Sequence, residues 1–230
     1  GAAPRHEIKH LVIDEMQDYS IVQYKVLSLL YPCKKTILGD INQSVNPFSS
    51  SSLPTIEKVF SGATTMTMLK SYRSTYEITQ FTKRIRPKIE VEAIERHGEE
   101  PQLLSCENTD DEILALQSLI SDFEKSGFNS LGIICKTQKI ADALYETLRY
   151  ERPMINLLNA TSASFGSGII IATAHLAKGL EFDNVIVPFC TNKNYHTEPD
   201  RQMLYVACTR AMHRLFITYS GKITPLIQQP

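Results

Sequence analysis

Short apolar runs alternate along the chain with longer segments in which apolar residues recur every three to four positions. The first run ends in acidic residues and predicts a buried strand, and the segment after it has the apolar spacing of a helix. By the same criteria we expect strands at 9–14, 35–39, 64–69, 102–105, 130–135, 155–158, 169–173, 184–188 and 214–219. Helices are expected at 19–30, 55–60, 75–86, 109–125, 139–149 and 200–211. This alternation predicts an α/β fold with a mostly parallel sheet.

Ligands of such sheets bind outside the carboxyl ends of the strands, so the residues after each strand are the first place to look for chemistry. The first strand is followed by Asp14, Glu15, Met16, Gln17 and Asp18. Two adjacent carboxylates after a buried strand are typical of nucleoside triphosphatases, in which one holds hydrated Mg²⁺ and the next activates water. The alternative is an acidic helix start, with Asp18 or Ser20 as the capping residue.

Four further segments follow or flank predicted strands. The segment 39–44 is separated from the acidic one by one helix and one strand, so the two are expected to be neighbours at the carboxyl edge of the sheet. The others are 70–74, 174–182 and 205–211, the last of which leads into the final strand.

Taken in order, these segments resemble five motifs of the superfamily 1 DNA helicases of the UvrD/Rep/PcrA type. DEMQD resembles motif II, LGDINQS motif III, LKSYRS motif IV, IIIATAHLAKGLEF motif V and QMLYVACTRAMHRLFI motif VI. The resemblance extends from about Leu11 to Tyr219. It implies RecA-like parallel sheets flanked by helices, of the P-loop NTPase type. Residues 1–66 would be the C-terminal remnant of the first RecA-like domain, and 67–230 the second domain.

The resemblance also implies an ATP-dependent DNA helicase or translocase that couples ATP hydrolysis to movement on nucleic acid. Asp14 would bind Mg²⁺, Glu15 would be the catalytic base, and Gln43 would sense the γ-phosphate. Arg73 and Arg210 would be arginine fingers on that phosphate. Phosphoryl transfer needs this combination of metal, water-orienting carboxylate and guanidinium charge.

The remaining roles implied by the resemblance concern ligand contacts. Tyr72 would stack near the adenine, while Gly179 and Glu181 would contact the ribose side of the nucleotide. The residues expected near DNA, either single-stranded or a duplex junction, are Phe48, Thr173, His175 and Lys178. Purely structural alternatives stay open for several of these side chains.

The structural alternatives concern four side chains. Tyr72 and Tyr205 would pack against the sheet, His175 would be a hydrogen-bonded turn residue, and Glu181 would cap a helix.

The chain departs from the family pattern because no G-x-x-x-x-G-K-[ST] sequence is present to cradle the β-phosphate. We therefore expect a C-terminal piece of a longer protein, with a missing N-terminal motor domain as its partner. ATP and Mg²⁺ would need the missing P-loop for full binding, so the 230-residue chain alone is expected to be inactive.

Two other departures favour a different partner. The roughly 100 residues between motifs IV and V leave no room for the large inserted domain of UvrD-type enzymes. After motif III, Asn46, Phe48 and Ser49 stand where the family has Tyr, Trp and Arg, which weakens the expected base-stacking platform. In these features the chain is most similar to the HelD-like branch, whose members are ATPases that bind and recycle bacterial RNA polymerase. The alternative function is therefore the motor portion of such a factor.

The composition and the net charge limit the class of protein, the partners and the cellular location that we expect. A hydrophobic share of 43% with a formal charge of −1 excludes a disordered chain, and the balance of 24 basic against 25 acidic residues shows no basic surplus for gripping DNA. Any nucleic-acid contact is thus expected to be local or shared with other parts of a longer chain. No transmembrane run or secretory signal is visible, and five scattered cysteines indicate neither zinc nor a disulfide framework. A cytoplasmic location without membrane contact is expected.

Overall fold

The computed structural model describes residues 3–43, 53–159 and 168–227. The chain divides into two compact units, Gly1–Met68 and Leu69–Pro230, which are described one at a time.

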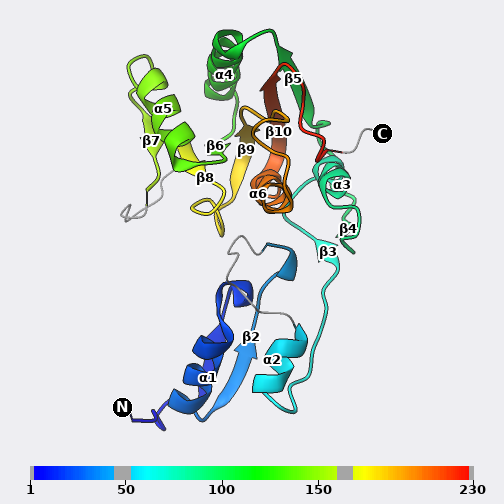
Figure 1. The fold of residues 1–230 in the computed structure, drawn as a ribbon, viewed down its shortest axis with the longest axis vertical. Helices are drawn as coiled ribbons and strands as arrows, with labels where there is room; N and C mark the ends of the chain where they lie inside the picture. The colour runs from blue at the N-terminus through cyan, green and yellow to red at the C-terminus, as the bar shows by residue number, and fades with distance from the viewer. Residues whose placement is uncertain (1–2, 44–52, 160–167, 228–230) are drawn as a thin grey trace. The chain divides into compact units, whose positions relative to one another are not determined.

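The first unit is built on two parallel strands, β1 (His10–Ile13) and β2 (Lys34–Ile37), paired in register from His10 with Lys34 to Ile13 with Ile37. Its helical elements are η1 (Met16–Asp18), α1 (Ile21–Leu30), η2 (Ile41–Gln43) and α2 (Leu53–Val59), drawn in blue to cyan in Figure 1. Ser20 caps α1 through a reciprocal capping box with Gln23, so it is the serine and not Asp18 that starts this helix. The core gathers Ile13, Met16, Tyr24 and Ile56.

The second unit contains a six-stranded sheet of order β5-β10-β9-β6-β8-β7, and every pair in it is parallel. The strands are β5 (Gln102–Cys106), β6 (Ser130–Cys135), β7 (Ile155–Leu157), β8 (Gly168–Thr173), β9 (Phe182–Val187) and β10 (Ala211–Ser220). The helices are α3 (Tyr76–Ile85), α4 (Thr109–Glu124), α5 (Gln138–Leu148) and α6 (Glu198–Cys208). The predicted α/β class, with a parallel sheet flanked by helices, is confirmed.

Helices cover both faces of this sheet (Figure 1). Alternate residues of the central strands, such as Ile133 and Ile171, pack in one core with apolar side chains of α4 and α5. The intervening residues, such as Ile134 and Val185, are also buried, on the side where α6 packs against β9 and β10 and α3 packs against α6. A parallel sheet buried on both sides explains why its strands read as continuous apolar runs.

The strand expected at 64–69 is not formed. Residues 61–70 are all exposed, and pairing starts only with the short β3 (Lys70–Ser71), which lies parallel to β4 (Glu92–Ala93). Met66 and Met68 supply the alternating apolar pattern of a strand but stay more than 80% exposed. Alternation alone does not make a strand when no neighbouring strand accepts its hydrogen bonds.

Within the three described ranges, no helix is both long and apolar enough to span a membrane.

Candidate functional site

The acidic segment lies at the carboxyl end of β1, beside the residues that leave β2. Leu38 N–H donates to the Ile13 carbonyl at 2.8 Å, and Met16 N–H donates to the Leu38 carbonyl at 2.8 Å. Parallel pairing of β1 with β2 therefore brings 14–18 and 38–43 together at one edge, where the sequence pattern expects them to meet.

Glu15 turns the chain sharply after β1. Its backbone is left-handed, with φ 53° and ψ 49°, and it is followed at once by η1. The Asp14 carboxylate accepts a hydrogen bond from Glu15 N–H at 2.8 Å. A left-handed conformation costs a side-chain-bearing residue roughly 1–3 kcal/mol and tends to be retained at functional sites.

Gln17 joins the two segments; it belongs to the DEMQD segment, but the resemblance gives it no role of its own. Its side chain is 1% exposed, its Nε2 donates to Glu15 Oε2 at 2.5 Å, and its Oε1 accepts from Asp40 N–H at 3.0 Å. Gly39 allows this approach, because a Cβ there would lie 2.6 Å from Met16 N and closer still to Gln17 Oε1.

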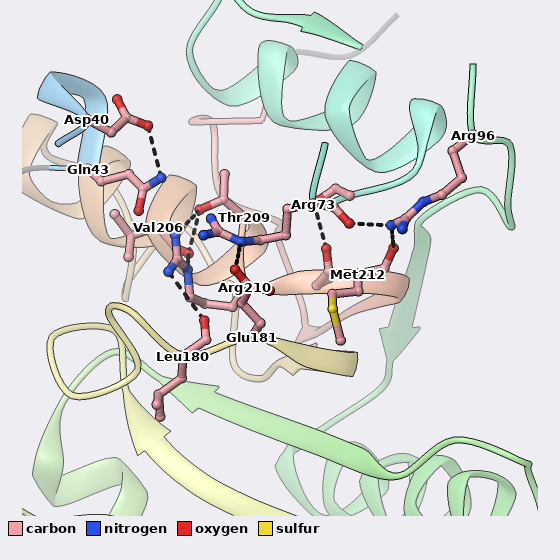
Figure 2. A network of polar contacts seen from close by, with 12 residues as sticks. Asp40, Gln43, Arg73, Arg96, Leu180, Glu181, Val206, Thr209, Arg210 and Met212 are labelled. Carbon is pink, nitrogen blue, oxygen red and sulfur yellow. Dashed lines mark hydrogen bonds and ion pairs between the residues drawn. The ribbon is translucent and has the colours of Figure 1, made fainter. Parts of the chain in front are cut away.

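Gln43 belongs to the same hydrogen-bonded network as Gln17 and Asp40. Its Nε2 donates to Asp40 Oδ2 at 2.9 Å, a contact drawn in Figure 2, while Asp40 Oδ1 accepts from Asn42 N–H at 2.8 Å. Asp40 thus holds η2 with its carboxylate and contacts Gln17 with its backbone.

A cavity of about 450 Å³ opens beside this edge, lined by Asp14, Glu15, Asp18, Tyr19 and Gln23. Carboxylate oxygens are the ligands Mg²⁺ prefers, and this ion is commonly held by one or two carboxylates together with water and substrate phosphates. The exposed Asp14 carboxylate fits that role. Among the described residues, no group of three or more His, Cys, Asp or Glu side chains is arranged to enclose a metal ion.

In the second unit, Arg73 and Glu181 form an ion pair, with Arg73 Nε 2.5 Å from Glu181 Oε1 (Figure 2). Arg96 holds the backbone of Arg73 in place: its Nη2 donates to the Arg73 carbonyl and, at 2.9 Å, to the Met212 carbonyl. Arg96 lies in the charged connection before β5, which has no periodic pattern that could have indicated this contact.

Arg210 is anchored at the junction of α6 and β10. Its Nε donates to the Val206 carbonyl at 3.2 Å, its Nη1 to the Leu180 carbonyl at 3.3 Å and its Nη2 to Thr209 Oγ1 at 3.3 Å (Figure 2). The guanidinium is therefore oriented by the end of α6 and by the segment that precedes β9.

Two of the predicted residues lie at the amino ends of parallel strands, because Glu181 directly precedes β9 and Arg210 directly precedes β10. For Arg210 this agrees with the sequence pattern, in which 205–211 leads into the final strand. Glu181 ends the 174–181 connection that leaves β8, so it follows one strand along the chain and lies at the start of the next.

Several of the alternative interpretations can now be separated. Tyr72 is 69% exposed and does not pack against the sheet, whereas Tyr205 is buried with the Arg86 guanidinium 5.8 Å from its ring centre. Glu181 pairs with Arg73 and caps no helix, because a strand starts at the next residue.

Three of the residues expected near nucleic acid, Thr173, His175 and Lys178, lie at the end of β8 or in the turn after it. His175 is exposed in a turn, Lys178 is half-buried, and Gly179 takes φ 80°, which suits a glycine. Thr173 is 7% exposed, and its Oγ1 accepts from Leu176 N–H at 3.4 Å, so it shapes the turn. Phe48, together with Asn46 and Ser49, lies outside the described residues.

Comparison with known proteins gives two family matches. Residues 2–62 match the UvrD/REP helicase N-terminal domain, and residues 153–222 match the UvrD-like helicase C-terminal domain. A protein of Acanthamoeba polyphaga mimivirus named as an ATP-dependent DNA helicase is 26% identical over 239 residues, covering 91% of this chain and 34% of that protein. The ATP-dependent DNA helicase Rep of Buchnera aphidicola subsp. Baizongia pistaciae is 26% identical over 142 residues, covering 54% of this chain and 20% of that protein. The chain thus spans about a third or less of these relatives.

Solved structures agree in fold. The C-terminal domain of a possible DNA helicase from Lactobacillus plantarum WCFS1 is 33% identical, with a TM-score of 0.57, over 68% of this chain and 92% of that one. Dbp5 of S. cerevisiae, solved with RNA and ADP BeF3, is 18% identical with a TM-score of 0.57 over 94% of this chain and 54% of that one. At that identity the second likeness concerns the fold alone.

Proposed function

The chain belongs to the UvrD/Rep family of helicases, and from this membership we propose that it carries part of an ATP-driven DNA motor. The observation that supports the proposal most strongly is the carboxyl edge of β1 and β2, where Asp14, Glu15 and Gln43 lie in one hydrogen-bonded constellation.

In the proposed reaction, Glu15 takes the proton of the water that attacks the γ-phosphate of ATP. Asp14 would hold Mg²⁺, which would neutralise charge on the phosphate oxygens. Arg73 and Arg210 supply guanidinium charge to the transferring phosphoryl group, a task that suits a planar group charged at every working pH. Tyr72, with its ring exposed, stacks on the adenine, and Gly179 and Glu181 contact the ribose side.

Binding of the β-phosphate is assigned to a P-loop in another part of the protein. The 230 residues contain no G-x-x-x-x-G-K-[ST] sequence, and the relatives named as DNA helicases are about three times as long as this chain or longer. We assign 1–66 to the end of a first RecA-like domain and 67–230 to the second.

Coupling to DNA is assigned to the connection 174–181. It leaves the carboxyl end of β8 with His175 and Lys178 and reaches the amino end of β9 with Glu181, which binds Arg73. One short segment thus carries candidate DNA contacts at one end and a candidate nucleotide contact at the other.

The direct test is ATP hydrolysis by the full-length protein with and without single-stranded DNA. We expect hydrolysis that rises when DNA is added and that falls when His175 and Lys178 are both replaced by Ala. The matched control replaces Lys193 and His196, also exposed or nearly so but outside the motifs, and should leave DNA stimulation unchanged. ATPase activity indifferent to DNA would contradict a DNA motor.

A HelD-like RNA polymerase-recycling ATPase is the second candidate. The formal charge of −1 supports it. So does the stretch between Arg73 and Thr173, because its described residues all belong to helices, strands and connections of the second compact unit and none of them forms a separate inserted domain. Contacts to phosphates weaken steeply with salt, whereas a protein interface is less sensitive. Titration of the full-length protein against labelled single-stranded DNA and against RNA polymerase core, at low and near-physiological salt, separates the two. Tight, salt-sensitive DNA binding without a polymerase complex excludes the second candidate.

A further inference from the structure

The side chain of Gln17 joins the acidic segment to the segment after β2, with one hydrogen bond at each end of its amide. Its amide has just one orientation that satisfies both partners. Carboxylate oxygens accept hydrogen bonds and the Asp40 N–H donates one, so Nε2 faces Glu15 and Oε1 faces Asp40.

The environment leaves Gln17 little freedom. The side chain is 1% exposed, and Gly39 and Met16 enclose it so closely that even a methyl group at position 39 would collide with it. A buried amide with both ends bonded holds its partners in place, because losing either bond strands a polar group away from water.

Glu15 needs such support because its backbone alone does not fix its carboxylate. The left-handed turn at φ 53° aims the side chain, while the contact from Gln17 Nε2 at 2.5 Å fixes the position of Oε2. Positioning to within a fraction of an ångström is what general-base catalysis demands.

We propose that Gln17 is a positioning residue for ATP hydrolysis: it fixes the carboxylate of Glu15 and ties it, through the Asp40 backbone, to the η2 segment that carries Gln43. The inference rests on the proposed function. Gln17 itself need not touch the nucleotide; it acts through Glu15.

Two substitutions test the pair of hydrogen bonds by which Gln17 joins Glu15 to Asp40, called here the Gln17 bridge. Gln17→Met keeps the volume and removes both hydrogen bonds, whereas Gln17→Glu keeps an acceptor for Asp40 N–H and replaces the amide donor by a second carboxyl group against Glu15, which opposes Glu15 acting as a base. The chain offers a matched control in Gln117, whose Nε2 donates to Glu151 Oε2 at 2.8 Å on the surface of the second unit. Gln117→Met breaks the same kind of amide-to-carboxylate bond away from the site.

In the full-length protein, both Gln17 variants should lower kcat about 10- to 100-fold while KM for ATP stays within about twofold, as expected when only the transition state loses support. The control should keep kcat within about twofold. Because Gln17 acts through Glu15, Gln17→Met should cause no further loss in a Glu15→Gln background, measured in single turnovers. Unchanged kcat in both Gln17 variants, or an equal loss in both backgrounds, would overturn the proposal.

A second readout does not depend on activity. In the 230-residue chain, hydrogen exchange at the Asp40 amide should speed up at least about tenfold in Gln17→Met and stay near the wild-type rate in Gln17→Glu and Gln117→Met. If the Asp40 amide of Gln17→Met exchanged at the wild-type rate, the Gln17 bridge itself would be refuted. If the wild-type full-length protein hydrolyses no ATP although Asp40 behaves as expected, the proposed function fails and the bridge is only structural.

Discussion

Glu15 has one of two positive backbone φ angles found at non-glycine positions in the described residues, the other being at Phe189. The conformation is compensated by neighbouring contacts: Asp14 Oδ1 accepts its N–H, and Gln17 binds its carboxylate. A residue held in an unfavourable conformation by its surroundings is what a site arranged for function, rather than for stability, often contains.

Asp200 is a residue whose charge serves stability. Its carboxylate forms an ion pair with Lys136 Nζ at 2.6 Å and accepts the backbone N–H groups of His196 and Thr197 at 3.0 Å each. Burial opposes ionisation, but these hydrogen bonds outweigh it and lower the pKa of Asp200 from 3.8 to about 2. The folded state therefore gains stability above pH 4 that it loses as the pH falls toward 2.

We predict that Asp200→Asn lowers the free energy of unfolding by roughly 2 kcal/mol at pH 7. The difference from wild type should shrink steadily between pH 4 and pH 2, because the wild-type carboxylate becomes protonated there. Urea unfolding of both proteins across that range is the measurement. A difference that is the same at pH 7 and pH 2.5 would show that the charge of Asp200 is not the cause.

Individual site residues differ in how far the sequence could predict them. Asp14 and Glu15 follow a recognisable apolar run, so their place at a strand end is readable from the pattern. Gln17 is not readable in the same way, because its role depends on a contact with Asp40, 23 residues away. Arg96 is similar, since its partners Arg73 and Met212 come from distant parts of the chain.

At the scale of elements, the junction of α6 and β10 fixes Arg210. The helix starts at a capping box formed by Thr197 and Asp200 and ends at Cys208, and the strand begins at Ala211. Phe182 N–H donates to the Arg210 carbonyl at 3.0 Å, so the backbone of this residue is also tied to the start of β9.

Replacing Arg210 by Ala in the full-length protein should lower kcat by roughly 10³-fold or more if the guanidinium acts as an arginine finger. Steady-state hydrolysis at saturating ATP measures this. Arg214→Ala is the matched control, because Arg214 lies on β10 but pairs with Glu99 on the surface, and its kcat should stay near wild type. Near-wild-type turnover in Arg210→Ala would refute the motif VI assignment.

The start of α4 is tied to β9 and β10 by one buried carboxylate. Glu112 is fully buried, and its Oε1 accepts from Phe189 N–H at 2.7 Å and from Thr218 Oγ1 at 2.6 Å. This carboxylate links the first turn of the helix to Thr218 within β10 and to Phe189 just beyond β9.

We expect Glu112→Ala to lower the free energy of unfolding by about 2–3 kcal/mol, because two donors lose their acceptor in a buried place. Glu112→Gln keeps an oxygen for both donors and should cost clearly less. Urea unfolding of the two variants beside wild type is the check. Equal losses would mean that side-chain volume, not hydrogen bonding, makes the contribution.

Much of the order of elements is predictable because the central parallel strands are apolar runs and five helices, α1, α3, α4, α5 and α6, start at a side-chain cap. The 64–69 strand fails for a physical reason: the local pattern cannot tell whether a partner strand exists.

At the scale of the whole molecule, the residues with proposed roles in ATP hydrolysis are divided between the two compact units. Asp14, Glu15 and Gln43 belong to the first unit, and Arg73, Glu181 and Arg210 to the second. Within each unit these residues are held by contacts inside that unit. Substitutions in one unit can therefore test its residues and leave the other unit unchanged.

The 230-residue chain by itself should hydrolyse no ATP above a buffer blank. Without a P-loop the phosphates are not held near Glu15, and both binding energy and positioning are lost. A sensitive phosphate-release assay on the purified chain tests this. Turnover that is present in the chain and abolished by Glu15→Gln would show that its own residues suffice.

The most direct test of the proposed ATP chemistry compares ATP binding and ATP hydrolysis in the full-length wild-type protein and in Glu15→Gln. The substitution removes the base while nearly preserving the shape of the side chain. We expect the Kd for ATP to stay within about threefold and hydrolysis to fall by about 10²-fold or more. Hydrolysis close to the wild-type rate in Glu15→Gln would contradict the assignment of Glu15 as the catalytic base.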